Sequence, residues 1–288
     1  MSFATSFRAC SPFSNARADR RGDRGWALVS TLWTITMLAL MAAATETLTA
    51  TSYRAEAHAI TAAKAEAATD AAVVRAVLGI SDIRPQSRWR VDGQPRRFWF
   101  EGVPVNVSVQ GELGRVDLNT ASGALIRQML VGNGVSLDTA TKLTDRILAW
   151  RSATGLEGLK ASDDDYASLP YKPRHGPFQT VDEVKLVLGM TPALYAMIEP
   201  AITIYSKRQT FDESIAPREA LRALYPNDES KIDSVLRLRE SAVQQTSHAG
   251  QAFTVEAVSS IGNRSFRRTA VVQMTGSDAR PYYVLRWQ

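Results

Sequence analysis

The sequence predicts an α+β fold in which a long amino-terminal helix packs on a small antiparallel sheet, with a large all-α domain inserted into the sheet part. The helix is predicted because an apolar run at residues 26–44 continues into an Ala-rich stretch with neither Pro nor Gly before Gly79. Short alternating runs then occur on both sides of a block, residues 117–262, whose spacing is mostly helical. A helical domain inserted into a small sheet is the economical topology for that order.

Residues 26–44 have the length and composition of a transmembrane helix. At 1.5 Å rise per residue, about 19 uncharged residues come close to the ~30 Å thickness of the bilayer core. The run contains no Pro or Gly, so a helix satisfies all its backbone groups internally. The preceding leader, residues 1–25, carries five arginines, which favour the cytoplasmic side. We therefore expect a single-pass protein with a cytoplasmic amino terminus and with its folded part on the other side.

Other interpretations of this segment stay open on these residues alone. The small residues 42–44 are typical of a signal-peptidase site, and a cut there would make the apolar run a secretory signal. Arg20 and Arg21 are a feature of twin-arginine signals, although those usually have a longer spacing. A chain that is not cut at all would be a plain anchored protein.

The composition argues against nucleic-acid binding and against catalysis. Much of the net charge of +5 belongs to the leader, so the rest of the chain is only weakly basic. The one cysteine, Cys10, also lies in the leader and gives no disulfide to the remainder. His58, His175 and His248 have no neighbouring cysteine or nucleophile motif, and each is expected on the surface. No metalloprotease, P-loop or dinucleotide motif occurs, and we expect no enzyme.

Residues 45–80 are expected to continue the helix into solvent, with Gly79 ending it. Its apolar positions at helical spacing are Ala57, Ile60, Ala63, Ala67, Val74 and Leu78. The sheet part is expected in residues 81–116 and 263–288. Its strands are expected at residues 89–91, 97–100, 103–109, 266–274 and 282–287.

The helical block, residues 117–262, contains a weak internal repeat that divides it into residues 117–208 and 209–262. The first copy contains VDLNTASGALIRQML at 116–130, DRILAWR at 145–151 and PFQTVDEVKLVLGM at 177–190; the second contains SIAPREALRAL at 214–224, SVLRLRE at 234–240 and AFTVEAVSSIG at 252–262. Because matched pieces keep their order, each copy is expected to be a small helical module.

The order of these motifs resembles the helical domain of the type II secretion pseudopilins of the K family. The resemblance lies in VDLNTAS, then WR, then DDDYASLPYKPRHGPF, then VDEVKLVLGMTPALYAMIEPAITIYS, and extends over residues 25–288. It implies a pilin-like fold with two related, SAM-like helical subdomains and a bacterial inner-membrane protein with a periplasmic domain. It also implies a subunit at the tip of the pseudopilus. The implied partners are minor pseudopilins of the I and J type, a prepilin peptidase and the inner-membrane secretion platform.

The leader is similar to a prepilin leader, which a peptidase cuts after a glycine directly before the apolar run. This implies cleavage between Gly25 and Trp26 and a first segment of residues 26–44 that stays on the mature chain. Most prepilins have glutamate as the fifth mature residue, whereas Ser30 stands there. That absence is similar to the K family, whose tip subunit needs no subunit ahead of it. An anchored protein unrelated to prepilins would lack the glutamate as well.

Asp163, Asp164 and Asp165 form the densest acidic cluster. Calcium prefers carboxylate oxygens, and K pseudopilins bind calcium, so the resemblance implies a metal site here. In that family acidic residues commonly follow the Trp-Arg pair, whereas this chain has Ser152 and then Ala-Thr. A solvated acidic loop, or a cap of a short turn, explains the cluster equally well.

The alternative function is binding of DNA by a helix-hairpin-helix module of the kind found in membrane-anchored competence receptors. LNTAS followed by two helices and a turn at residues 132–135 resembles that module, whose turn presents N–H groups to a phosphate. The nearest cations are Arg127 and Lys142, which is a sparse basic surround. The turn is otherwise a simple connection between two packed helices.

Overall fold

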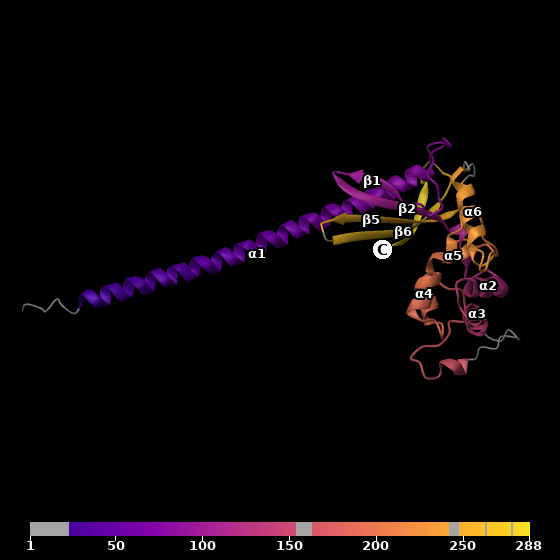
Figure 1. Ribbon diagram of the computed structural model, residues 1–288, viewed down its shortest axis with the longest axis horizontal. Coiled ribbons are helices and arrows are strands. Elements are labelled where there is room, and N and C mark those ends of the chain that lie inside the picture. Colours follow the sequence, from indigo (N-terminus) through magenta and orange to yellow (C-terminus); the bar gives the residue numbers. More distant parts are fainter. Residues whose placement is uncertain (1–22, 154–162, 242–247, 263, 278) are drawn as a thin grey trace, which may run out of the picture. The chain divides into compact units, whose positions relative to one another are not determined.

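The computed structural model describes residues 23–153, 163–241, 248–262, 264–277 and 279–288 (Figure 1). The chain divides into two compact units, Met1–Ile60 and Thr61–Gln288. Helix α1, Asp23–Ile80, begins in the first unit and ends in the second. The long helix predicted from the absence of Pro and Gly is therefore confirmed.

Gly79 does not end α1 in the way the sequence suggested. The helix includes this residue and stops at Ile80. A Cβ atom on Gly79 would lie 2.4 Å from the indole ring of Trp89, so the missing side chain makes room for that ring. The Trp89 N–H also donates to the Gly79 carbonyl at 2.9 Å. Gly79 thus serves the packing of the chain that returns towards the sheet.

The second unit contains a five-stranded antiparallel sheet in the order β1-β2-β5-β6-β7. The strands are β1 (Arg96–Phe100), β2 (Val103–Gly111), β5 (Ala252–Ile261), β6 (Arg264–Met274) and β7 (Tyr282–Trp287). Of the strands predicted at 89–91, 97–100, 103–109, 266–274 and 282–287, only the first is wrong. That segment is irregular, with a single bridge from Asp92 to Gln110. Trp89 and Val91 pack into the core, and the Val91 carbonyl accepts from the Gly111 N–H of β2 at 2.7 Å although the segment forms no strand.

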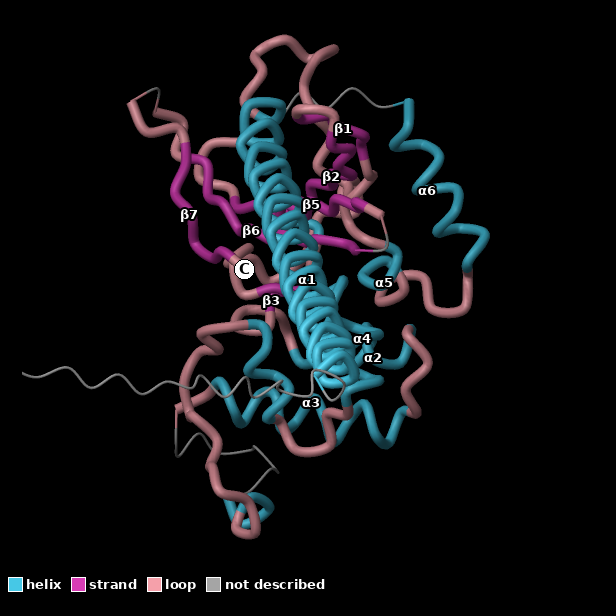
Figure 2. The backbone as a smooth tube through the Cα atoms, turned by 90° about the vertical axis from the view of Figure 1, so that its left-hand side faces the viewer, coloured by secondary structure: helices cyan, strands magenta, loops and turns pink. Residues whose placement is uncertain are grey.

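One face of this sheet packs on the last part of α1 (Figure 2). Val103, Val105, Val107 and Val109 are buried, as the two-residue alternation of a half-buried strand requires. Their partners on α1 are mostly small and include Ala68, Ala72, Val73, Ala76 and Val77. Small side chains on a helix allow its backbone to approach the strands closely. At the side of the helix, Arg268 of β6 donates to Asp70 at 2.6 Å and to Glu66 at 2.8 Å.

The inserted domain lies between β2 and β5, which are neighbours in the sheet (Figure 1). Its helices are α2 (Gly123–Gly132), α3 (Leu137–Arg151), α4 (Pro192–Ile198), α5 (Arg218–Leu221) and α6 (Glu229–Ser241), with short 3-10 turns η1 (Glu112–Gly114), η2 (Asp163–Tyr166), η3 (Val181–Leu186) and η4 (Glu199–Ala201) and the parallel pair β3 (Val116–Asp117) and β4 (Ile202–Thr203). Gly111 pairs with Phe253, so the chain enters and leaves the insertion side by side.

The closing piece of the second repeat, residues 252–262, is a strand and not a helical segment. It forms β5, between β2 and β6, with Phe253, Val255 and Ala257 buried on alternate positions. The apparent match of Phe178 with Phe253 was therefore wrong, because the two residues lie in different kinds of structure. The insertion occupies the residues between Gly111 and Ala252, where the sequence had predicted residues 117–262.

Candidate functional site: the apolar helix, the motif cluster and the hairpin turn

The amino-terminal part of α1 offers a continuous apolar surface. Within the residues that the structure describes, one helical segment, Gly25–Ala44, is long and apolar enough to span a membrane, and none of it is buried against other parts of the chain. Its large exposed side chains are Trp26, Leu28, Val29, Leu32, Trp33, Ile35, Met37, Leu38, Leu40 and Met41. An unpacked apolar helix of 20 residues fits a single-pass membrane anchor.

The hydroxyl groups of this segment are satisfied within the helix. Ser30 donates to the Ala27 carbonyl at 3.0 Å, and Thr31 donates to that of Leu28 at 2.9 Å. The Thr34 and Thr36 side chains make the same kind of bond one turn back. A helix with these bonds would enter lipid without unpaired side-chain donors at these positions. The assembly role predicted for Ser30, and cleavage between Gly25 and Trp26, stay predictions.

The solvent-facing side of α1 carries a second apolar surface within residues 61–80. Ala63, Ala67, Val74 and Leu78, which we call the outer stripe, are exposed, whereas the sheet packs on other positions. Val74 is 47% exposed and Leu78 61%. The apolar spacing noted in the sequence thus marks a face that the chain itself leaves uncovered. That spacing did not identify the buried face, because alanines occur on both sides of the helix.

The first motif, VDLN, forms a cluster of hydrogen bonds around the Asp117 side chain. Its buried carboxylate accepts from the backbone N–H of Asn119 at 2.8 Å and from that of Lys207 at 2.8 Å. It also accepts from the Ser206 hydroxyl at 3.2 Å. Because Asp117 and Thr203 are paired at the carboxyl end of the parallel β3–β4 ladder, the carboxylate joins the segments that follow the two strands.

Residues of the WR and GPF motifs contact the VDLN motif. Asn119 exchanges two hydrogen bonds with the backbone of Phe178, at 3.0 and 2.7 Å. Arg151 donates to the carbonyls of Leu118 at 2.6 Å and Ala121 at 2.7 Å. The Trp150 ring stacks on Phe178, with centroids 6.2 Å apart and planes inclined by 10°. The VDLN, WR and GPF residues therefore act together as the internal frame of the insertion.

Glu183 joins this frame through its ionised side chain. It accepts from the Trp150 indole at 3.2 Å and from the Gln179 N–H at 2.8 Å, and it pairs with Arg174. Burial favours the neutral acid, but the donors outweigh burial and hold the pKa of Glu183 below its usual value. Thr180 and Glu183 do not form a capping box, since the Thr180 hydroxyl makes no cap bond and the Glu183 carboxylate accepts from the Gln179 N–H. The segment is a 3-10 turn, η3, and not an α-helix.

The turn between α2 and α3 is covered by α5. A Cβ atom on Gly132 would lie 2.1 Å from the Arg222 carbonyl oxygen, so the two backbones touch. The Asn133 side chain donates to the Glu219 carbonyl at 2.8 Å and accepts from Arg222 at 3.3 Å. The N–H groups of Asn133, Gly134 and Val135 all donate back to carbonyls of α2. These bonds leave the three turn donors engaged, which favours a packing role over phosphate binding.

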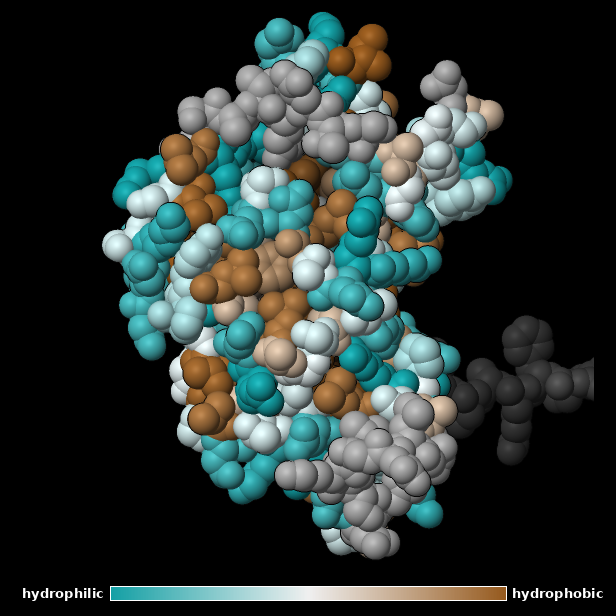
Figure 3. All heavy atoms as spheres, turned by 90° about the vertical axis from the view of Figure 1, so that its right-hand side faces the viewer, coloured by the Kyte–Doolittle hydropathy of each residue, from teal (hydrophilic) through white to brown (hydrophobic). Residues whose placement is uncertain are grey.

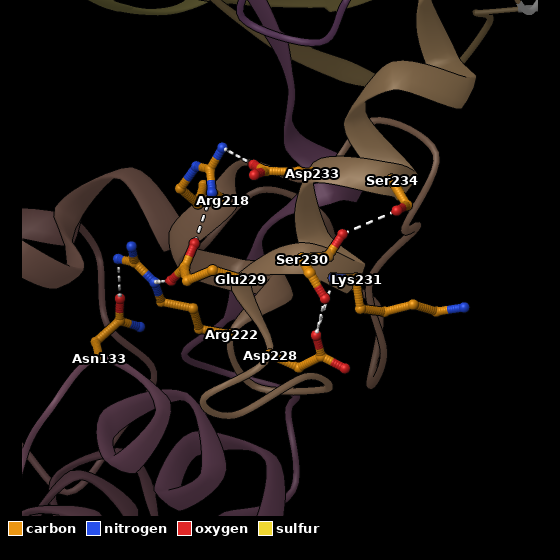
Figure 4. A network of polar contacts seen from close by, with 9 residues as sticks. All are labelled: Asn133, Arg218, Arg222, Asp228, Glu229, Ser230, Lys231, Asp233 and Ser234. Carbon is orange, nitrogen blue, oxygen red and sulfur yellow. Dashed lines mark hydrogen bonds and ion pairs between the residues drawn. The ribbon is translucent and has the colours of Figure 1, made fainter.

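An ionic network extends from this turn to α6 (Figure 4). Arg222 donates to Glu229 at 2.8 Å, and Arg218 reaches both Glu229 at 2.6 Å and Asp233 at 2.5 Å. Asp228 accepts from the Lys231 N–H at 2.9 Å, at the start of α6. The arginines near the turn are thus bound to carboxylates of the second module.

The acidic cluster is only partly visible. Asp165 is exposed, with its carboxylate 3.8 Å from the Arg146 guanidinium. The side chains of Asp163 and Asp164 lie outside the described residues. Elsewhere in the described part of the chain, no three His, Cys, Asp or Glu residues form a group suited to a metal. Carboxylates have the chemistry that calcium requires, but the Arg146 charge opposes a cation at Asp165. The calcium site stays a prediction.

One of the three histidines, His248, departs from the expected surface position. His248 is half-buried and not on the surface as expected, and its ring packs edge-on against Phe253 at 5.1 Å. Burial lowers the pKa of His248 below its usual value. Its packing against β5 explains the burial, and the sequence gave no sign of this contact because β5 was predicted to be helical.

The fold and these contacts define a class: an anchored α+β protein whose helix-packed sheet carries a helical insertion held by a polar and aromatic frame. Residues 108–207 match the family model for the type II secretion system (T2SS), protein K. This part of the chain is a type II secretion protein K domain, and the resemblance predicted from the motifs is confirmed.

The structure is similar to a chain in the crystal structure of the GspK-GspI-GspJ complex from the type 2 secretion system of enterotoxigenic Escherichia coli. The TM-score is 0.57, and the match covers 82% of this chain and 98% of that chain. At 16% sequence identity the likeness is one of fold. A comparison with curated proteins finds no match.

Proposed function

We propose that this chain is a minor pseudopilin of a type II secretion system, anchored by residues 26–44 and assembled through the outer stripe of α1. The observation that carries this proposal is the combination of the protein K domain with an exposed, membrane-length apolar helix. The same helix, α1, continues to the part on which the sheet packs. Small exposed residues on the outer stripe suit close contact with helices of other subunits.

The proposed topology has the leader in the cytoplasm and the sheet and insertion in the periplasm. The five leader arginines support this orientation. A prepilin peptidase would cut between Gly25 and Trp26, leaving the apolar run on the mature chain. Ser30, which lacks a carboxylate, suits a subunit with no subunit ahead of it.

A position at the tip of the pseudopilus is supported by the bulk of the insertion between β2 and β5. A domain of this size would obstruct a subunit stacked above it. The structurally similar chain comes from a complex named for GspK, GspI and GspJ. By analogy, I-type and J-type minor pseudopilins are the proposed partners, and the inner-membrane secretion platform is the proposed assembly site.

The amino terminus of the mature protein tests the processing step. The full chain is produced together with a prepilin peptidase and sequenced from its amino terminus. A chain that begins at Trp26 supports the proposal. A chain that begins after residue 44, or that stays uncut, overturns it, and Gly25→Val serves as the uncut reference.

The outer stripe is tested separately by co-purification of the full chain with I-type and J-type pseudopilins. Leu78→Lys places a charge on the stripe and is expected to lower recovery of the complex at least about tenfold. Ile83→Lys, at a residue 87% exposed and outside the helix, is the matched control and should leave recovery unchanged. Equal recovery of both variants would show that assembly uses another surface.

Calcium binding at Asp163, Asp164 and Asp165 is a second, weaker proposal that rests on the chemistry of the carboxylates. Equilibrium binding of calcium to the full chain is the measurement. Binding that Asp164→Asn reduces supports the site. No binding, or binding that this substitution leaves unchanged, removes it.

A further inference from the structure

The two edges of the sheet differ in how they are protected. β1 begins with Arg96 and Arg97, both exposed, and charged side chains deter another chain from pairing with an edge. β7 is apolar along its exposed length. Tyr283, Val284, Leu285 and Trp287 are each 43–49% exposed. Natural edge strands are rarely left in this state, so β7 has the character of a strand that receives a partner.

The exposed apolar residues of β7 follow one another along the strand and are interrupted by Arg286. On the face in Figure 3, which is opposite to that in Figure 2, apolar and polar side chains of the described residues are interspersed. The one charged side chain of β7, Arg286, is directed to Asp182 on η3 of the insertion. It is therefore already engaged and does not guard the free edge.

The outer backbone groups of β7 can pair with an extended partner chain. The strand pairs with β6 on one side and ends the sheet on the other (Figure 2). Its outward N–H and C=O groups form ladder bonds only with another extended chain. A register shift between Val271 and Val272 leaves Leu285 without an opposite residue in β6, so the ladder is irregular at this point. The Leu285 side chain is 44% exposed on a face of the sheet, where it can contact a side chain of an added strand.

The surroundings of β7 are basic. Residues 264–288 contain five arginines and a single aspartate. Arg267 pairs with Glu256, Arg268 with Glu66 and Asp70, and Arg286 with Asp182. Arg264 starts β6 opposite Ile261, away from β7, which pairs with residues 270–274. Arg280 pairs with no carboxylate among the described residues and lies over the Tyr283 ring at 5.2 Å. A second copy of this chain would bring a like charge against Arg280, whereas an acidic segment complements it.

We propose that β7 is a strand-addition site that binds an extended, acidic segment of another protein, with apolar residues facing Tyr283 and Leu285 and carboxylates near Arg280. The site is distinct from the outer stripe of α1, which lies on the helix side that faces away from the sheet. Loss of one contact therefore leaves the other to be measured.

The test uses the full chain in detergent micelles and a fluorescent peptide, Glu-Thr-Val-Thr-Val-Thr-Glu, with binding followed by anisotropy. One control peptide has Lys at both ends, and another has Pro at its centre. The acidic peptide is expected to bind at least about tenfold more tightly than the Lys peptide, and the Pro peptide not to bind. Bound peptide should slow hydrogen exchange of β7 amides.

Variants locate the site. Leu285→Glu and Tyr283→Glu, both at exposed positions, should weaken binding at least about tenfold, because the added charge repels the acidic peptide, whereas Trp99→Glu on the β1 edge should not. Circular dichroism identifies any variant that fails to fold, and either β7 variant suffices. Absence of binding, equal binding of the acidic and Lys peptides, or binding unaffected by the β7 variants would overturn the proposal. Self-association that Leu285→Glu abolishes would also overturn it, in favour of a second copy.

Discussion

Replacing Gly132 by Ala should destabilise the insertion, because the backbone of α5 occupies the space that a Cβ atom would need. The added atom would lie 2.1 Å from the Arg222 carbonyl oxygen, below the 3.0 Å that Cβ contacts essentially never breach. The two helices must therefore separate by about 1 Å. Overpacking of this kind costs about 1–3 kcal/mol, and the better helix propensity of Ala returns at most about 1 kcal/mol. We expect a net loss of about 1–2 kcal/mol.

The assay is thermal unfolding of the full chain in detergent, followed by circular dichroism. A loss of that size should lower the midpoint by about 2–8 °C for a domain of about 200 residues. Gly176→Ala is the matched control, since its nearest neighbour atom would be 3.8 Å away. A Gly132→Ala protein as stable as the control would refute the contact. A variant that keeps full stability but loses affinity for DNA would instead support the helix-hairpin-helix alternative.

Three further predictions concern the frame and the helix–sheet contact. Asp117→Asn should lower the free energy of unfolding in urea by about 2–3 kcal/mol, because the amide leaves N–H groups such as that of Lys207 poorly paired; an unchanged urea midpoint would contradict this. Because the pKa of Glu183 is depressed in the folded protein, its contribution to the free energy of unfolding is complete above about pH 4.5 and is lost as the pH falls through the folded pKa. Glu183→Gln should therefore be less stable than the wild type at pH 7 and closer to it at pH 3.5. A difference in stability that does not depend on pH would contradict this. Arg268→Gln should cost about 0.5–1 kcal/mol at low salt and less at 1 M salt, since its bonds to Asp70 and Glu66 are partly exposed; urea unfolding at both salt concentrations measures it.

The sequence predicted the helix and most strands because their signals are local. A run without Pro or Gly predicts a helix whatever it packs on, and alternating valines at 103–109 predict a half-buried strand. The prediction was wrong at residues 252–262, where the supposed repeat favoured a helical segment although Phe253, Val255 and Ala257 alternate as in a strand. That alternation was present in the sequence and would have predicted β5. The exposed face of α1 was not predictable, because only the sheet determines which alanines are covered.

The candidate site was predicted as a set of motifs, but not as an arrangement. Ser122 caps α2, whereas Asn119 of the same motif exchanges hydrogen bonds with the backbone of Phe178. The contact of Gly132 with Arg222 joins residues 90 positions apart, so no local pattern reveals it. The signal that was available is the need of buried polar groups for partners, which marks Asp117 as structural once its side chain is known to be buried.

The residues that match the family model, 108–207, contain this frame. The frame depends on particular atoms: an amide at Asn119 that both donates and accepts, and a guanidinium at Arg151 that reaches two carbonyls. The helix face and the sheet instead require small or alternating apolar side chains, which several residue types supply. The hydrogen bonds of the frame therefore restrict which side chains fit there more than the packing of the sheet on α1 does.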